Sequence, residues 1–202
     1  DQITGPEFSG LNLTALKSFE DIYQKQFLDT LIPLEKSKYL AGLKISEYQI
    51  MDLGFGGGIP LLILADYFKN QTILGVDARA KKVEAVNKIA KNIGLNNVVA
   101  KHARLEEIFF NKPTILTFKA VGKICEILNQ ISANSKVICC FYKGPNVEEL
   151  ESIEPQKNWT VCEDISYDLA GQQGRRFLVY ELDVPHGTKS RTQILLSDIA
   201  TR

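Results

Sequence analysis

A glycine-rich segment holds the strongest chemical signal in this sequence. It reads Gly54-Phe55-Gly56-Gly57-Gly58 and comes directly after a short apolar run that contains Asp52. Glycines let the chain turn sharply, and they let the backbone approach a ligand because no Cβ intervenes. The next apolar run ends at Asp77, whose carboxylate can accept hydrogen bonds from both hydroxyls of an adenosine ribose. The pattern predicts a site for a nucleoside-containing ligand.

The charge beside the loop favours a cationic ligand over a pyrophosphate. Dinucleotide-binding folds carry Gly-x-Gly-x-x-Gly and hold a pyrophosphate anion at a helix N-terminus. This loop reads Gly-x-Gly-Gly-Gly instead, and a carboxylate suits a ligand with a sulfonium and an amino group. The sequence therefore predicts S-adenosylmethionine, bound by Asp52, Gly54, Gly56, Gly58 and Asp77. A glycine-rich turn beside an exposed aspartate, with no ligand, is the alternative.

Strands and helices alternate around this loop. Strands are expected at 48–53, 72–76, 97–100, 114–118 and 136–141, and helices at 61–68, 79–93 and 121–131. Such alternation implies right-handed crossovers, and so an α/β fold with a Rossmann-like, doubly wound, mostly parallel sheet. A last strand pair, at 159–165 and 177–182, has no helix between its members, which indicates an antiparallel hairpin at one edge.

The ends of the chain differ from this core. We expect a single domain with an N-terminal helical extension at 1–47, a Rossmann-like catalytic core at 48–184 and a loosely held polar tail at 185–202. In the extension, Ser18 and Asp21 resemble a capping box, and Pro33 is expected to end one helix or begin the next.

Composition excludes several classes of protein. The 202 residues carry no formal net charge, which argues against a protein that coats nucleic acid non-specifically. There is no C-x-x-C pair and there are only two histidines, so no metal is expected. No apolar run approaches the roughly 20 residues that span a bilayer. We expect a cytoplasmic protein without a membrane partner, with reduced thiols at Cys125, Cys139, Cys140 and Cys162.

Seven segments, in order along the chain, carry a further signal: residues 12–14, 27–31, 52–60, Asp77 with Lys81-Lys82, residues 103–106, Lys143-Gly144 and residues 174–176. Together they resemble the motifs of one known family, the bacterial 16S rRNA guanine-N7 methyltransferases, also called glucose-inhibited division protein B. The resemblance implies the seven-stranded sheet of class I methyltransferases and covers roughly residues 12–182.

The resemblance also implies roles for single residues. Gly54 and Ile59 would line the methionine and ribose end of S-adenosylmethionine, and Asp77 would hold the ribose. Leu105 and Glu106 would lie at the adenine. Lys119 stands where the family has an arginine that contacts cofactor or substrate. Lysine keeps the charge but lacks the planar fork that makes bidentate contacts.

The implied reaction needs alignment more than acid–base chemistry. Guanine N7 has a free lone pair, so no proton must leave before it attacks a methyl group. We expect Lys119, Lys143 and Arg176 to hold phosphates or the guanine O6, with Arg104 and Lys25 in support. The implied partner is 16S ribosomal RNA or the small ribosomal subunit, and a monomer is expected.

Three other functions share the glycine loop. One is a methyltransferase that acts on a small molecule or a protein, another is a non-catalytic cofactor-binding module, and the third is a nicotinamide dehydrogenase. The loop and Asp77 exclude none of them. The N-terminal helices, Lys143 and Arg176 are the features that favour RNA.

Overall fold

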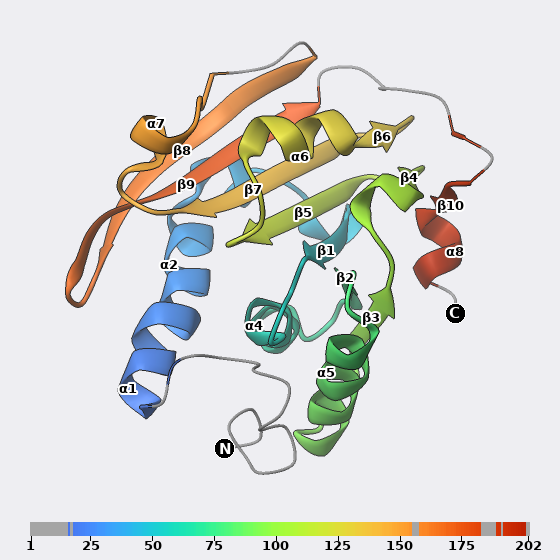
Figure 1. The fold of residues 1–202 in the computed structure, drawn as a ribbon, viewed down its shortest axis with the longest axis horizontal. Helices are drawn as coiled ribbons and strands as arrows, with labels where there is room; N and C mark the ends of the chain where they lie inside the picture. Colours follow the sequence, from blue (N-terminus) through green and yellow to red (C-terminus); the bar gives the residue numbers. More distant parts are fainter. Residues whose placement is uncertain (1–15, 17, 155–157, 183–188, 191, 201–202) are drawn as a thin grey trace.

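A seven-stranded sheet forms the centre of the computed structural model, which describes residues 16, 18–154, 158–182, 189–190 and 192–200. All strand contacts are parallel except those made by the last two strands, which form an antiparallel hairpin at one edge. The α/β, mostly parallel sheet expected from the sequence is confirmed (Figure 1). In spatial order the strands are β3 (Val98–His102), β2 (Ile73–Asp77), β1 (Gln49–Leu53), β5 (Thr114–Lys119), β7 (Val137–Lys143), β9 (Gln172–Leu182) and β8 (Trp159–Leu169).

Helices cover both faces of this sheet. One face packs against α2 (Asp29–Lys36), α3 (Lys38–Ala41), α4 (Ile59–Tyr67) and α5 (Ala80–Asn92), whereas α6 (Ile124–Gln130) and α7 (Val147–Leu150) pack against the other. Adjacent strand residues therefore enter different cores. Cys139 belongs to the α6 side and Cys140 to the α2 side, as strand alternation predicts. Both are free thiols.

The first helices of the chain follow one another without a break. α1 (Phe19–Ile22) continues through a π-helical segment, Tyr23–Leu28, into α2. The Ser18 half of the predicted capping box is confirmed, because the amide of Asp21 donates to the Ser18 hydroxyl over 3.0 Å; the Asp21 carboxylate accepts from that hydroxyl. The segment 12–14 lies outside the described residues.

Pro33 neither ends nor begins a helix, so that expectation is wrong. It lies inside α2, which continues to Lys36. A proline cannot donate to the carbonyl four residues earlier. Here that carbonyl, on Asp29, has the Tyr167 hydroxyl of the neighbouring strand 3.4 Å away. The break falls instead at Ser37, whose extended backbone ends α2 and whose hydroxyl accepts from the Leu40 amide to start α3.

The last described residues are not a loosely held end. β10 (Ile194–Leu195) pairs with β4 (Ile108–Phe110), which also pairs with β6 (Ser132–Ala133). α8 (Leu196–Ala200) buries Leu196 and Ile199 against the α6 side of the core. Figure 1 shows α8 beside β4, across the molecule from α1 and α2. Among the residues described, no helix is long and apolar enough to cross a bilayer.

Gly75 in β2 lets the glycine loop and α4 approach the sheet. A Cβ built there would lie 2.2 Å from a methyl carbon of Leu61 and 2.9 Å from the ring of Phe55. Both side chains are buried, so they cannot move aside cheaply. We expect Gly75→Ala to lower the free energy of unfolding by about 1–3 kcal/mol in urea titrations. Gly144→Ala is the control, since nothing lies within 4 Å of its Cβ position. Equal losses in the two variants would contradict this packing argument.

Candidate functional site

Three hollows open where the parallel strands end. The first, here called the loop hollow, measures about 410 Å³ and is lined by the glycine loop, Asp77 and Lys119. The strand hollow measures about 190 Å³ and also reaches Gly54 and Asp77. The basic hollow measures about 540 Å³ and lies on the other side of Lys119. Since Lys119 lines the first and third hollows and Gly54 the first and second, the three hollows adjoin one another, and together they are here called the depression.

The glycines of the loop serve two purposes. Gly54 has a φ of 67°, and a Cβ there would lie 2.7 Å from a methyl carbon of Val121. Gly54 lines both the loop and strand hollows, and any side chain at this position would collide with Val121. Gly58 has a φ of 80°, and its Cβ would meet Val86 of α5 at 2.6 Å. Gly58 is therefore required by packing, and it does not line the three hollows.

Asp77 is held by the backbone and still faces the depression. Its Oδ2 accepts from the Gly56 amide over 2.9 Å, and its Oδ1 accepts from the Arg79 amide over 2.8 Å. An ionised carboxylate has about four acceptor sites, so one further bond to each oxygen remains possible. Asp77 is 8% exposed and lines both the loop and strand hollows. It is the one carboxylate on the shared wall of those two hollows that could accept from two adjacent hydroxyls.

Asp52 is buried beneath the loop. Its Oδ1 accepts from the Thr117 hydroxyl over 2.8 Å, whereas its Oδ2 has no hydrogen-bond partner within the described part of the chain. Burial raises the pKa of Asp52 to about 7, against the opposing effects of the Thr117 hydrogen bond, Lys119 and the Leu61 amide. Asp52 lines none of the three hollows. The geometry therefore places it as a support for the loop and for the first turn of α4, while its predicted contact with the cofactor stays a prediction.

Lys119 lies at the junction of the loop and basic hollows. Its Nζ is 2.8 Å from Asp29 Oδ2 and donates over 3.0 Å to the carbonyl of Lys25, in the π-helical segment. Burial lowers the pKa of Lys119, and the adjacent Asp29 carboxylate opposes that shift. The next residue, Ala120, has a φ of 56°, a left-handed conformation that is uncommon for alanine. This turn directs Val121 toward Gly54.

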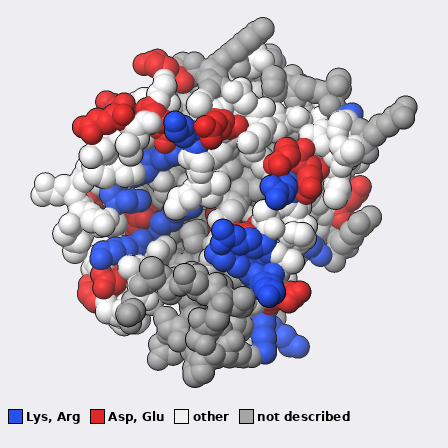
Figure 2. All heavy atoms as spheres, in the orientation of Figure 1, with Lys and Arg blue, Asp and Glu red and all other residues white. Residues whose placement is uncertain are grey.

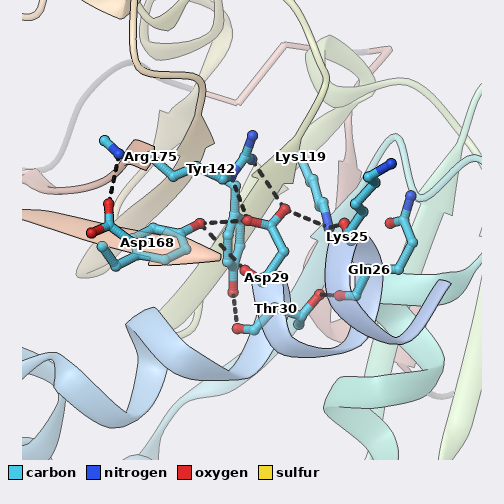
Figure 3. Close-up of polar contacts among 10 residues, drawn as sticks. Lys25, Gln26, Asp29, Thr30, Lys119, Tyr142, Asp168 and Arg175 are labelled. Carbon is cyan, nitrogen blue, oxygen red and sulfur yellow. Dashed lines mark hydrogen bonds and ion pairs between the residues drawn. The ribbon is translucent and has the colours of Figure 1, made fainter. Parts of the chain in front are cut away.

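Asp29 also pairs with a second cation, Arg175, at the wall of the basic hollow, as Figure 3 shows. Arg175 Nε lies 2.5 Å from Asp29 Oδ1, and Arg175 Nη2 donates to Oδ2 over 3.0 Å. The Tyr167 hydroxyl donates to Oδ1 over 2.7 Å. Although burial alone would lower the pKa of Arg175, the Asp29 carboxylate raises it. Sequence reasoning did not select Asp29 or Arg175 as site residues, and an acidic residue inside the apolar stretch 27–31 was the available signal.

The other two cations predicted for catalysis have carboxylate partners. Lys143 lines the basic hollow, and its Nζ lies 2.6 Å from Glu151 Oε1 and 3.0 Å from the Gly122 carbonyl. Arg176 binds Asp164 and Glu148 and does not line the three hollows. Strand alternation explains this placement: Arg175 shares a face with Phe177, which packs on the α2 side of the sheet where Asp29 lies, whereas Arg176 points to the other side, where it meets Glu148 of α7. The geometry thus favours Arg175 over Arg176 as a substrate contact.

The remaining predicted residues surround the depression. Ile59 lines the loop hollow, and Leu105, Glu106 and Arg104 line the strand hollow. Lys25 lines the basic hollow while it pairs with Asp21. Figure 2 shows Lys and Arg over the centre and left of one face, with Asp and Glu beside several of them and along the rim. Basic side chains therefore gather on this face although the whole chain carries no net charge.

Comparison with known proteins identifies the family of this chain. The family model GidB, described as rRNA small subunit methyltransferase G, matches residues 9–178. The chain belongs to this family. It is 33% identical over 154 residues to the ribosomal RNA small subunit methyltransferase G of Mesoplasma florum, covering 73% of this chain and 61% of that protein. It is 32% identical over 184 residues to the protein of the same name from Fervidobacterium nodosum, covering 86% and 82%.

A solved structure shares the fold of this methyltransferase G family member. It is an S-adenosylmethionine-dependent methyltransferase from Aquifex aeolicus, with a TM-score of 0.53 at 14% identity over 86% of this chain and 97% of the other. The fold class expected from the sequence is thereby confirmed.

The residues at the depression fit S-adenosylmethionine, the cofactor of such methyltransferases. Gly54 lines both the loop and strand hollows, and a Cβ there would collide with Val121. Asp77 lines the same two hollows and has capacity for one further hydrogen bond at each oxygen. An extended ligand with a ribose at its middle could therefore lie across both hollows, with its reactive end toward Lys119.

Asp52 makes stability depend on pH. Because its pKa is near 7 in the folded chain and near 3.8 in the unfolded chain, the folded state keeps a proton that the unfolded state loses. The free energy of unfolding should fall as pH rises from about 4 to 7, by about 4 kcal/mol from this group. Asp52→Asn should remove that slope in urea titrations between pH 5 and 8. An unchanged slope in the variant would refute this assignment.

Proposed function

We propose that this chain transfers the methyl group of S-adenosylmethionine to N7 of a guanine in 16S ribosomal RNA. The supporting observation is that one segment, residues 119–121, contributes to all three hollows. The loop and strand hollows, here called the cofactor trough, fit S-adenosylmethionine, and the basic hollow beside them is lined by cations. Membership of the methyltransferase G family supports the ribosomal substrate. We assign the activity to the cytoplasm, where that substrate is found.

The basic hollow is the candidate acceptor site. It adjoins the cofactor trough at Lys119 and Ala120, and its wall carries Lys25, Lys119, Lys143 and Arg175. These side chains suit a polyanionic substrate, because phosphate contacts made by Lys and Arg position nucleic acid on a protein. A guanine that enters the hollow must leave its stack, which costs least in a single-stranded loop.

Alignment is the main task of these residues. The cofactor, when bound, supplies an electrophilic methyl group on a sulfonium. The chain must hold guanine N7 about 3–3.5 Å from that carbon and in line with the sulfur. Since N7 already bears a lone pair, no base is needed. This agrees with the basic hollow, where Lys119, Arg175 and Lys143 are all held by carboxylates and the buried Tyr142 hydroxyl donates to the Thr30 carbonyl.

A labelling experiment tests this proposal directly. Small ribosomal subunits that lack the modification are incubated with the chain and tritiated S-adenosylmethionine, and the labelled base is mapped. We expect label at one guanine N7, and a loss of at least about 100-fold in rate for Lys119→Ala. Lys136→Gln is a matched control, because its ion pair with Glu181 lies at the opposite end of the sheet. Measurable cofactor binding with no label on the RNA would overturn the ribosomal substrate.

Salt should weaken RNA binding far more than cofactor binding. If about three phosphates are held by Lys and Arg, raising salt from 50 to 200 mM should lower RNA affinity by about tenfold or more. The affinity for S-adenosylmethionine should change by less than about threefold, since that ligand releases few counterions. Filter binding and calorimetry measure the two affinities. Equal salt dependences would contradict a phosphate-binding acceptor site.

A further inference from the structure

Asp29 is a saturated carboxylate at the wall of the basic hollow. It is 2% exposed, and its two oxygens face Lys119, Arg175 and the Tyr167 hydroxyl, all within 3.0 Å. With its acceptor sites occupied by protein donors, Asp29 has little capacity left for a ligand. Its effect is to fix the positions of two cations that come from different strands.

Both cations keep donors that point away from Asp29. The Lys119 ammonium has three N–H groups, and Asp29 and the Lys25 carbonyl accept two of them. Arg175 faces Asp29 through Nε and Nη2 and also hydrogen-bonds the Tyr167 hydroxyl, and its guanidinium carries five N–H donors in all, so it keeps donors beyond these contacts. Two cations and one carboxylate leave a surplus of one positive charge. Among the described residues, the charged groups of this part of the wall therefore offer hydrogen-bond donors, while the acceptor sites of Asp29 are taken by protein donors.

Such a wall distinguishes the two purines. On the edge that carries N7, guanine presents the O6 acceptor, whereas adenine presents the N6 amino donor. When N7 faces the methyl group, the neighbouring exocyclic atom is the one that meets the wall. A carbonyl there can accept from Lys119 or Arg175, and an amino group would place its hydrogens against a cation without an acceptor.

We propose that Lys119 and Arg175 read O6 of the target guanine and that Asp29 is the positioning residue that aims them. This inference rests on the proposed function, and it adds the atom that the site recognises. It also assigns recognition to Arg175 and away from its neighbour Arg176, whose guanidinium is bound by Asp164 and Glu148.

Purine analogues test which atom is read. Small subunits are reconstituted with RNA that carries inosine or 2-aminopurine at the guanine identified by labelling. Inosine keeps N7 and O6 but lacks the 2-amino group, whereas 2-aminopurine keeps N7 and the amino group but lacks O6. We expect kcat/KM for inosine within about tenfold of guanine, and a loss of about 100-fold or more for 2-aminopurine. The opposite order would overturn the inference. Guanine RNA measured alongside shows separately whether the proposed function holds.

Variants test whether Asp29 acts through the two cations. Asp29→Asn keeps the shape but removes the counter-charge, and Arg175→Gln removes one donor group. Each should reduce the preference for guanine over 2-aminopurine by about tenfold, with cofactor affinity changed less than about threefold. Lys136→Gln, remote from the hollow, should keep the full preference. If both variants lose activity on the two bases equally, Asp29 is only structural and the inference fails. Arg175→Gln gives the decisive result if Asp29→Asn does not fold.

Discussion

The buried carboxylate of Asp29 joins four elements of the structure at one point. It lies in the first turn of α2 and receives donors from β5, β8 and β9, through Lys119, Tyr167 and Arg175. A lone charge at 2% exposure would be strongly unfavourable, so each donor is needed to offset its desolvation. Together these contacts hold the N-terminal helices against the ends of the strands. The basic hollow exists because that docking leaves space between them.

The π-helical segment before α2 belongs to the same arrangement. A π-helix bonds its amides one residue further back than an α-helix does, which changes the direction of nearby carbonyls. In this segment the Lys25 carbonyl accepts from the Lys119 ammonium, and the Gln26 carbonyl accepts from the Thr30 hydroxyl. The Lys119 ammonium thus has two fixed acceptors, the Asp29 carboxylate and the Lys25 carbonyl. The compact ammonium group suits this enclosed position, because it needs less room than a guanidinium.

The cofactor trough depends on a different constraint, the close approach of backbone segments. Gly75 lets α4 pack closely on the sheet, and Gly54 lets Val121 pack against the glycine loop without a collision. Asp77 then fixes the loop by accepting from the Gly56 amide while it keeps acceptor capacity for a ligand. Asp52 supports the loop from beneath at an electrostatic cost, shown by its raised pKa. The loop is therefore shaped before any ligand arrives.

Sequence alone determined the alternating strands and helices, the antiparallel hairpin and the glycine loop that ends at Asp77. These features depend on local periodicity and turn chemistry, which neighbouring residues encode. The sequence alone did not determine that Pro33 lies within α2. The Asp29 carbonyl, which Pro33 cannot bond, lies near the Tyr167 hydroxyl, and that hydroxyl comes from a strand more than a hundred residues later. Nor did the sequence choose between Arg175 and Arg176. Adjacent residues in a strand point to opposite faces, and only the pairing of β9 with β7 decides which arginine meets Asp29. The site is set by side chains from distant parts of the chain, so its charge balance exists only in the folded molecule.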